Sequence, residues 1–343
     1  MKGTICWALA VLITLSAVFF QRRTGPSNPE RIQTEVSGHI FNISLPRSLV
    51  RPADLSEGAQ LSIPVKCSEE ARESIIGAVV YYKRYPGNYI FKAVVPSFTV
   101  EDNDLIIKAN LPVQPAAGKI VYYVQLIGRD GSMVNPGQAT LRFRNRVPDG
   151  ILIIHVLLMF AAMLFSTFSG LYALCRNVRV NSYVVTTLLT LFAGGFIFGP
   201  IVQKFAFGQY WTGWPFGEDL TDTKTMIALL VWLTAYIVNR VVLKKYGKTA
   251  REYIAQNTAG QHAAAEGIAG AAASTAGVVG GVPGVDAEPD PVQTNAAKAA
   301  MKLNRWKLLY VLAALITLAV YSIPHSLSGS EYDYETNTII TGN

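Results

Sequence analysis

Five apolar stretches constrain this chain more than any other feature of its sequence. Four of them are about 20 residues long, the length at which an α-helix crosses roughly 30 Å of hydrocarbon. They are Ile151–Leu174, Tyr183–Val202, Met226–Leu243 and Leu308–Pro324, and a shorter stretch, Thr4–Phe20, lies near the N-terminus. Charged residues make up 15% of the chain, against roughly 25% in soluble proteins. The sequence therefore predicts a membrane protein that has the lipid bilayer as a partner.

The N-terminal region, residues 1–23, has two interpretations. Lys2 precedes its apolar core and Arg22 and Arg23 follow it, but no small-x-small cleavage site closes it. The sequence favours an uncleaved signal anchor, which gives five spans, over a cleaved signal peptide, which gives four. In both interpretations the region that follows is exported.

The distribution of Lys and Arg sets the expected orientation, because cytoplasmic loops carry an excess of basic residues. The loop that contains Arg176 and Arg179 is basic, as are the residues in and beside 244–304, whereas the tail at 326–343 is acidic. We expect a bacterial inner (cytoplasmic) membrane, with the N-terminus inside and both residues 24–147 and the tail outside. The net charge of +7 then reflects orientation, and we expect no nucleic-acid partner.

Residues 24–147 have a different pattern, in which short runs rich in Val, Ile, Tyr and Phe alternate with turn residues. Seven runs at this spacing predict a β-sandwich. They are Gly38–Ser44, Gln60–Lys66, Gly77–Arg84, Tyr89–Val95, Leu105–Leu111, Lys119–Gly128 and Ala139–Arg144. Because adjacent residues of a strand point to opposite faces, we expect one tyrosine of each pair, 81–82 and 122–123, in the core and the other at the surface.

The stretch LPVQPAAGKIVYYVQLIGRDGS, residues 111–132, resembles the late strands of immunoglobulin-like or fibronectin type III-like extracytoplasmic domains. In those domains a turn containing proline precedes a Tyr-Tyr strand. The resemblance implies a multi-domain membrane protein that combines an all-β Ig-like sandwich with an α-helical transmembrane bundle.

The rest of the chain divides by composition. Residues 148–243 hold three predicted transmembrane helices, with an outer loop at 204–225. Residues 244–304 are basic and of low complexity, and the Ala- and Gly-rich part, 257–298, predicts a flexible cytoplasmic linker. Residues 305–325 form the last predicted transmembrane helix.

The outer loop FAFGQYWTGWPFGEDLTDTKT, residues 205–225, is the strongest candidate binding segment. Trp and Tyr also gather in interfacial belts, and Thr221 or Asp222 suits the N-cap of the next helix. The loop resembles the tryptophan-rich (WWD) segment of cytochrome c assembly, haem-handling membrane proteins. Trp211, Trp214 and Asp219 correspond to that motif.

In that family the segment lies on the outer face between two histidines that ligate haem iron. The resemblance implies haem as the cofactor, with His155 and His325 as the flanking pair, since the expected topology places both at the same outer level. Imidazole is a suitable axial ligand for haem. The other interpretation of a single histidine in a span is a hydrogen bond to a neighbouring helix.

Three functional classes follow from these observations. The spans contain almost no ionisable residues, which disfavours an ion-coupled transporter, and no Walker-type, HExxH or GxSxG motif points to an enzyme. We expect an accessory or structural subunit that presents an Ig-like domain and a Trp-rich ligand- or partner-binding loop to other membrane or envelope proteins. Haem handling in cytochrome assembly or electron transfer is the alternative, and a sensor signalling to residues 244–304 is the third class.

Overall fold

The computed structural model describes residues 2–25, 27–56, 58–175, 180–272, 291–323 and 330–340. For the described residues among 2, 247–297, 299–300 and 303–304 it describes the backbone alone. Two compact units divide the chain, and their boundaries fall within helices. One unit comprises residues 14–161, 190–227 and 319–343, and the other comprises residues 1–13, 162–189 and 228–318. We call them the sandwich unit and the helical unit.

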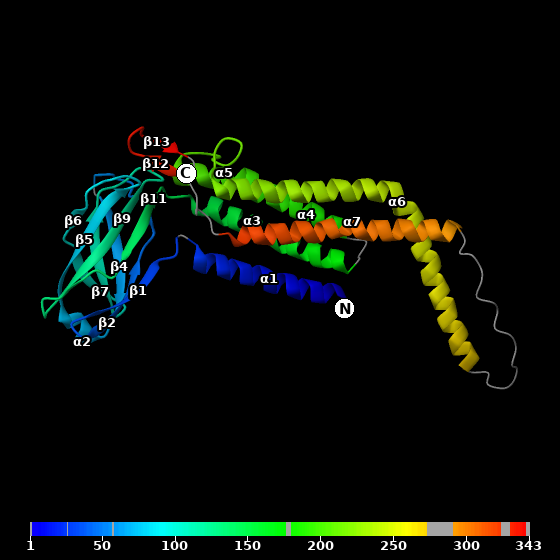
Figure 1. The fold of residues 1–343 in the computed structure, drawn as a ribbon, viewed down its shortest axis with the longest axis horizontal. Coiled ribbons are helices and arrows are strands. Elements are labelled where there is room, and N and C mark those ends of the chain that lie inside the picture. Colours follow the sequence, from blue (N-terminus) through cyan, green and yellow to red (C-terminus); the bar gives the residue numbers. More distant parts are fainter. Residues whose placement is uncertain are drawn as a thin grey trace. The chain divides into compact units, whose positions relative to one another are not determined.

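Five helical segments among the described residues are long and apolar enough to cross a membrane (Figure 1). They are Gly3–Thr24, Asp149–Leu174, Val180–Phe207, Leu220–Tyr246 and Arg305–Ser322. The first, second, fourth and fifth belong to α1 (Lys2–Thr24), α3 (Asp149–Leu174), α6 (Leu220–Ala272) and α7 (Pro291–Ser322); the third combines α4 (Val180–Phe192), the π-helix η1 (Ala193–Phe198) and α5 (Gly199–Phe207). These segments coincide with the five predicted apolar stretches, and the chain is a membrane protein.

Helices α6 and α7 extend well beyond their apolar segments. The sequence predicts a flexible linker over 257–298, but residues 257–272 belong to α6 and residues 291–298 belong to α7. Alanine has the highest helix propensity of all residues, and this explains why an Ala-rich, low-complexity sequence is helical here. The middle of the predicted linker, 273–290, lies outside the described residues.

Two sheets form a β-sandwich. The first has the strand order β1-β2-β4-β8-β7 and the second has the order β3-β11-β9-β5-β6, with β10 paired to β9. The strands of the first sheet are β1 (Glu30–Val36), β2 (His39–Leu45), β4 (Ala59–Lys66), β7 (Ser97–Glu101) and β8 (Asp104–Leu111); those of the second are β3 (Ser48–Val50), β5 (Ile75–Tyr85), β6 (Lys92–Val94), β9 (Lys119–Gly128), β10 (Met133–Val134) and β11 (Gln138–Arg144). The pair β3 and β11 is parallel, and the other pairs are antiparallel.

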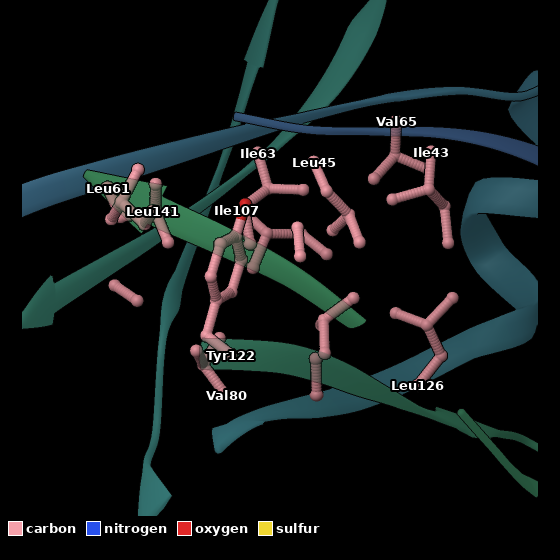
Figure 2. Packing of buried hydrophobic residues seen from close by; sticks show 14 of the residues in the cluster. Ile43, Leu45, Leu61, Ile63, Val65, Val80, Ile107, Tyr122, Leu126 and Leu141 are labelled. Carbon is pink, nitrogen blue, oxygen red and sulfur yellow. The ribbon is translucent and has the colours of Figure 1, made fainter. Parts of the chain in front are cut away.

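Figure 2 shows the core of the sandwich, where apolar side chains of the two sheets face each other. Leu61 and Ile63 from the first sheet and Tyr122 and Leu141 from the second are fully buried. Along β4, buried residues alternate with more exposed ones, as expected for a strand with one face on a core. The period-two pattern of the sequence is therefore the direct cause of the sandwich.

All seven predicted runs contain a strand, although the run at Tyr89–Val95 is reduced to the short strand β6. The prediction missed the short strands β3, β7 and β10, the helix α2 (Glu69–Ser74), and β1. In β1 only Val36 is fully buried, although exposure alternates along the strand. Its sequence, ERIQTEV, is too polar to show the apolar alternation of the other strands. The strand pairs with the whole length of β2, and its Ile32 and Val36 pack against the core.

The two tyrosine pairs divide between core and surface, as predicted. Tyr122 is buried, Tyr82 packs against the same core, and the two residues lie opposite each other on β9 and β5. Tyr81 and Tyr123 stack with ring centroids 4.9 Å apart on the other face of the sheet. The Tyr122 hydroxyl donates a hydrogen bond of 2.8 Å to the Pro46 carbonyl.

We expect Tyr122→Phe to lower the free energy of unfolding of the sandwich by about 1–2 kcal/mol, because the Pro46 carbonyl loses its donor inside the protein. Chemical denaturation of the purified chain, followed by sheet circular dichroism, measures the change. Tyr81→Phe is the matched control, since the Tyr81 hydroxyl lies 3.4 Å from Gln125 at a partly buried site. If both substitutions lower the free energy of unfolding equally, the hydrogen bond to Pro46 contributes no more stability than the contact with Gln125.

In the helical unit, aromatic residues join the helices. Trp7 of α1 stacks on Phe168 of α3 with ring centroids 4.1 Å apart. Trp232 of α6 stacks on Tyr310 of α7, and its Nε1 donates a hydrogen bond of 2.9 Å to the Thr317 hydroxyl. Helix α1 therefore packs into this unit through a specific aromatic contact.

Candidate functional site at the outer loop and C-terminal tail

The predicted outer loop is an ordered turn between two helices. Helix α5 ends at Gly208, which adopts the left-handed conformation with φ of 86°, as is common for glycine at a helix C-terminus. Helix α6 then begins at Leu220. Its N-terminus is capped by Asp219, whose Oδ1 accepts a 2.8 Å hydrogen bond from the Thr221 backbone N–H. The expectation that Thr221 or Asp222 is the N-cap is therefore wrong by two or three residues.

Thr212 lies at the centre of the loop. Its backbone N–H donates to Oδ2 of Asp222 at 2.7 Å, and its hydroxyl lies 3.3 Å from carboxylate oxygens of both Asp219 and Asp222. Gln203 of α5 completes the network: with its amide turned to suit its neighbours, it accepts from the Thr212 hydroxyl and donates to Asp222 at 3.1 Å. The loop is thus fastened to both flanking helices by hydrogen bonds that bury Thr212 and Asp219.

Gly213 is required by this arrangement. A Cβ atom on Gly213 would lie 2.4 Å from the Asp222 Cβ and 2.7 Å from the Thr223 backbone nitrogen. The loop and the first turn of α6 therefore pack more closely than any residue with a side chain allows.

Ser330 connects the C-terminal tail to the loop. Its backbone N–H donates to Oδ2 of Asp219 at 3.3 Å, and its hydroxyl lies 3.1 Å from that of Thr212. The Ser330 carbonyl accepts a 2.6 Å hydrogen bond from Nη2 of Arg142 on β11. One buried serine therefore contacts the outer loop through its N–H and hydroxyl and the sandwich through its carbonyl. We call Arg142, Thr212, Asp219 and Ser330 the junction.

Arg142 is held on a second side by an aromatic ring. Its guanidinium carbon lies 4.2 Å from the ring centroid of Phe207, the last residue of α5, within the range of a cation–π interaction. Burial lowers the pKa of Arg142, while the carboxylates of Asp219 and Glu331 act in the opposite direction. Arginine remains charged in proteins, so the junction contains a half-buried cation and the buried Asp219 carboxylate, whose charges attract each other.

Beyond Ser330 the tail forms a hairpin of β12 (Glu331–Asp333) and β13 (Thr338–Ile340). Glu331 forms an ion pair with Lys119 at the start of β9. The Tyr334 hydroxyl donates to the Lys119 carbonyl at 3.1 Å, and the guanidinium of Arg84 lies 4.8 Å from the Tyr334 ring centroid. Burial raises the pKa of Tyr334 to about 12. The acidic tail that the sequence indicates is therefore a structured part of the sandwich unit.

The structure brings three of the five predicted site residues together. The Trp211 indole donates to the Trp214 carbonyl at 3.2 Å and stacks on Phe196 of η1. Trp214 is 60% exposed, whereas Asp219 is 7% exposed. The Asp219 carboxylate is engaged by Thr221, Thr212 and Ser330, so it acts as a structural cap.

Of the two histidines predicted as haem ligands, the structure describes one. Nδ1 of His155 lies 3.0 Å from the Gly194 carbonyl, which also accepts the Gly199 N–H across the π-helical turn. Because a carbonyl only accepts, Nδ1 carries the proton and donates; in the neutral imidazole, Nε2 then has a lone pair. His325 lies outside the described residues.

The chemistry of this site is that of a structural connection. No group of three or more His, Cys, Asp or Glu side chains able to hold a metal ion occurs among the described residues. Thr212, Ser330 and Arg142 are not among the site residues predicted from the sequence. Thr212 lies between two tryptophans and Arg142 lies in the last predicted strand, whereas the sequence around Ser330 carries no signal.

The comparisons with known proteins do not assign a family. No protein-family model and no curated protein matches the chain. Among solved structures it shows a distant likeness to Astrotactin-2, described as a conserved vertebrate-specific and perforin-like membrane protein involved in neuronal development. The identity is 10% and the TM-score 0.21, over 49% of this chain and 36% of that one. The chain therefore spans little more than a third of the length of that protein.

Proposed function

We propose that this membrane protein is an accessory or structural subunit that holds an Ig-like domain outside the cytoplasmic membrane of a bacterium. The observation that carries the proposal is the junction. Through Ser330, it connects a β-strand of the sandwich, the loop between two apolar helices and the tail that follows the last helix. Such a connection suits a domain that must stay at a fixed place beside the membrane, because a domain on a single flexible linker would move freely.

The strand order supports the Ig-like assignment. Constant-type Ig domains set strands A, B, E and D against C, F and G, and variable-type domains add C′ beside C. In this chain β2-β4-β8-β7 corresponds to A-B-E-D, and β11-β9-β5-β6 corresponds to G-F-C-C′. Strand β1 is an addition at the edge, next to β2.

The junction also supports the expected topology. Segments in contact lie on one side of a membrane, so an even number of spans must separate them. Two apolar segments lie between the sandwich and the loop, and two more lie between the loop and the tail. The excess of Lys and Arg at the ends of the helices on the other side then places that side in the cytoplasm, and the packing of Trp7 favours an uncleaved α1.

Cysteine labelling tests the orientation. In a chain whose native cysteines are replaced, Glu218→Cys and Glu335→Cys should react with a membrane-impermeant maleimide added to spheroplasts, since both side chains are exposed. His262→Cys should react only after permeabilisation. The reverse pattern would place the sandwich in the cytoplasm and contradict the proposal.

The exposed aromatic residues of the loop are the proposed contact with a partner protein. Trp214 and Phe216 are 60% and 83% exposed, although hydrogen bonds hold the backbone of the loop in place. A photo-crosslinking amino acid at position 216 should give a discrete protein adduct in cells, and Trp214→Ala should reduce its yield. Adducts with lipid only would show that these residues form an interfacial belt.

Haem handling is the second candidate function. What favours it is the hydrogen bond from Nδ1 of His155 to a backbone carbonyl, since this second contact typically orients a histidine that ligates a metal through Nε2. Asp219 does not fit a role at the cofactor, because its carboxylate is engaged within the junction. Absorbance spectra of protein purified from haem-replete cells test the candidate. A Soret band that is lost in His155→Ala supports it, and a colourless preparation contradicts stable haem binding.

A further inference from the structure

Two of the three cysteines of the chain meet in the helical unit. Cys6 lies in the second turn of α1, and Cys175 follows directly after α3, which ends at Leu174. The two sulfur atoms are 3.4 Å apart, although the residues are 169 positions apart in the sequence. One thiol donates a hydrogen bond to the other, and both cysteines are in the reduced form.

The contact between α1 and α3 beside the cysteines is well packed. Trp7, the residue after Cys6, stacks on Phe168 of α3 with ring centroids 4.1 Å apart. Cys6 and Phe168 belong to one buried cluster, and Tyr172 packs against it. Side chains in such a cluster have little freedom to move. The position of the Cys6 thiol beside the end of α3 is therefore fixed by the packing of the two helices.

The two thiols differ in their access to solvent. Cys6 is 5% exposed, whereas Cys175 is exposed. Cysteines that react reversibly with oxidants are typically accessible and have a second, resolving cysteine next to them. Cys175 has the required access, and Cys6 has the position of the resolving thiol.

A disulfide between the two cysteines requires a small movement. Bonded sulfur atoms lie about 2.05 Å apart, so the two sulfurs need to approach each other by about 1.4 Å. Cys175 can supply this movement, because it lies beyond the end of α3 and its backbone N–H makes a long hydrogen bond of 3.3 Å to the Leu171 carbonyl. Cys67 belongs to the sandwich unit and is not part of the pair.

We propose that Cys6 and Cys175 form a reversible redox pair, which a peroxide oxidises to a disulfide that joins α1 to α3. The Cys175 sulfur attacks one oxygen of hydrogen peroxide, the O–O bond breaks, and the products are a sulfenic acid at Cys175 and one water molecule. The Cys6 sulfur then attacks the Cys175 sulfur, and the hydroxyl group leaves as a second water molecule with the Cys6 proton. Each thiol loses one electron, and the peroxide gains two.

A small thiol reductant restores both cysteines by thiol–disulfide exchange. This modification site goes beyond the accessory role proposed above and does not depend on it.

Counting free thiols tests the pair. The full chain in lipid nanodiscs is treated with hydrogen peroxide, denatured and labelled with a maleimide–polyethylene glycol, which adds one gel shift for each free thiol. We expect three labels before oxidation, one label after it, at Cys67, and three again after dithiothreitol. Three labels after peroxide would overturn the proposal, as would a loss that dithiothreitol does not reverse or a loss that occurs through disulfide-linked dimers on a non-reducing gel.

Single substitutions test the role of each thiol. Cys67→Ser is the matched control, in which peroxide should reduce the labels from two to none. In Cys6→Ser the sulfenic acid at Cys175 has no resolving thiol, so dimedone should label Cys175 after peroxide. In Cys175→Ser we expect no dimedone adduct at Cys6, because that thiol is buried. An adduct at Cys6 in Cys175→Ser, or a free pair of thiols after peroxide in Cys67→Ser, would contradict the assigned roles.

Discussion

Replacing Asp219 with alanine is expected to release the C-terminal tail from the outer loop. The substitution removes the N-cap of α6, worth about 1 kcal/mol, and leaves the buried N–H of Ser330 without its acceptor, at about 1–3 kcal/mol. It also removes one of the two carboxylates, those of Asp219 and Glu331, whose charge favours the protonated Arg142 guanidinium. We expect a total near 3 kcal/mol. Hydrogen exchange at residues 330–333 should then be faster by about two orders of magnitude.

Two matched variants separate the loss of the N-cap from the loss of the charge and of the contact with the tail. Glu218→Ala removes the adjacent acidic residue, which is exposed, and should leave exchange in the tail unchanged. Asp219→Asn keeps an oxygen for the N-cap but removes the charge, so it should give an intermediate effect. If Asp219→Ala alters exchange only in the first turn of α6, Asp219 caps the helix without holding the tail.

Trp232→Ala is expected to destabilise the helical unit by about 3 kcal/mol. Trp232 is fully buried, stacks on Tyr310 and donates to the Thr317 hydroxyl. Truncation of a buried Trp leaves a large cavity, and in a bilayer the loss of packing is the main cost because lipid offers no hydrophobic driving force between helices. Unfolding by SDS titration from mixed micelles, followed by circular dichroism, measures the change.

Trp232→Phe isolates the hydrogen bond, because it keeps most of the aromatic volume. Hydrogen bonds between membrane helices average about 0.6 kcal/mol, so this variant should lose less than a third of what Trp232→Ala loses. A loss in Trp232→Phe as large as in Trp232→Ala would show that the bond to Thr317, and not packing, joins α6 to α7.

The fold could be predicted where one physical pattern dominates a segment. Apolar stretches of sufficient length have no other favourable location than lipid, so all five predicted spans have a helical counterpart. In β4 and β9, apolar and polar residues alternate, so only one face of each strand can pack against a core. Strand β1 is not predicted because four of its seven residues are charged or amide side chains and only Ile32 and Val36 are apolar. The continuation of α6 over residues 257–272 is not predicted because an Ala- and Gly-rich composition is also typical of a flexible linker.

The site could be predicted only in part, because its contacts join residues that are far apart in the sequence. The density of Trp, Gly and Pro indicates the loop as a binding segment, and Trp211, Trp214 and Asp219 do lie together there. The role of Asp219 depends on Ser330, which is 111 residues away in sequence. Ser330 in turn is bound by Arg142 on β11. No local pattern indicates contacts at such separations. The haem ligands inferred from the resemblance remain a prediction.

The central claim is that the tail, the loop and the sandwich form one unit joined through Ser330. The hydroxyl oxygens of Thr212 and Ser330 lie 3.1 Å apart, so cysteines at these two positions lie within reach of a disulfide. In a chain without its native cysteines and with a protease site inserted between residues 273 and 290, Thr212→Cys with Ser330→Cys should keep both fragments together on a non-reducing gel after mild oxidation and cleavage. The pair Thr212→Cys with Thr336→Cys, at the exposed end of the hairpin, should not. Separate fragments from both pairs would contradict the account.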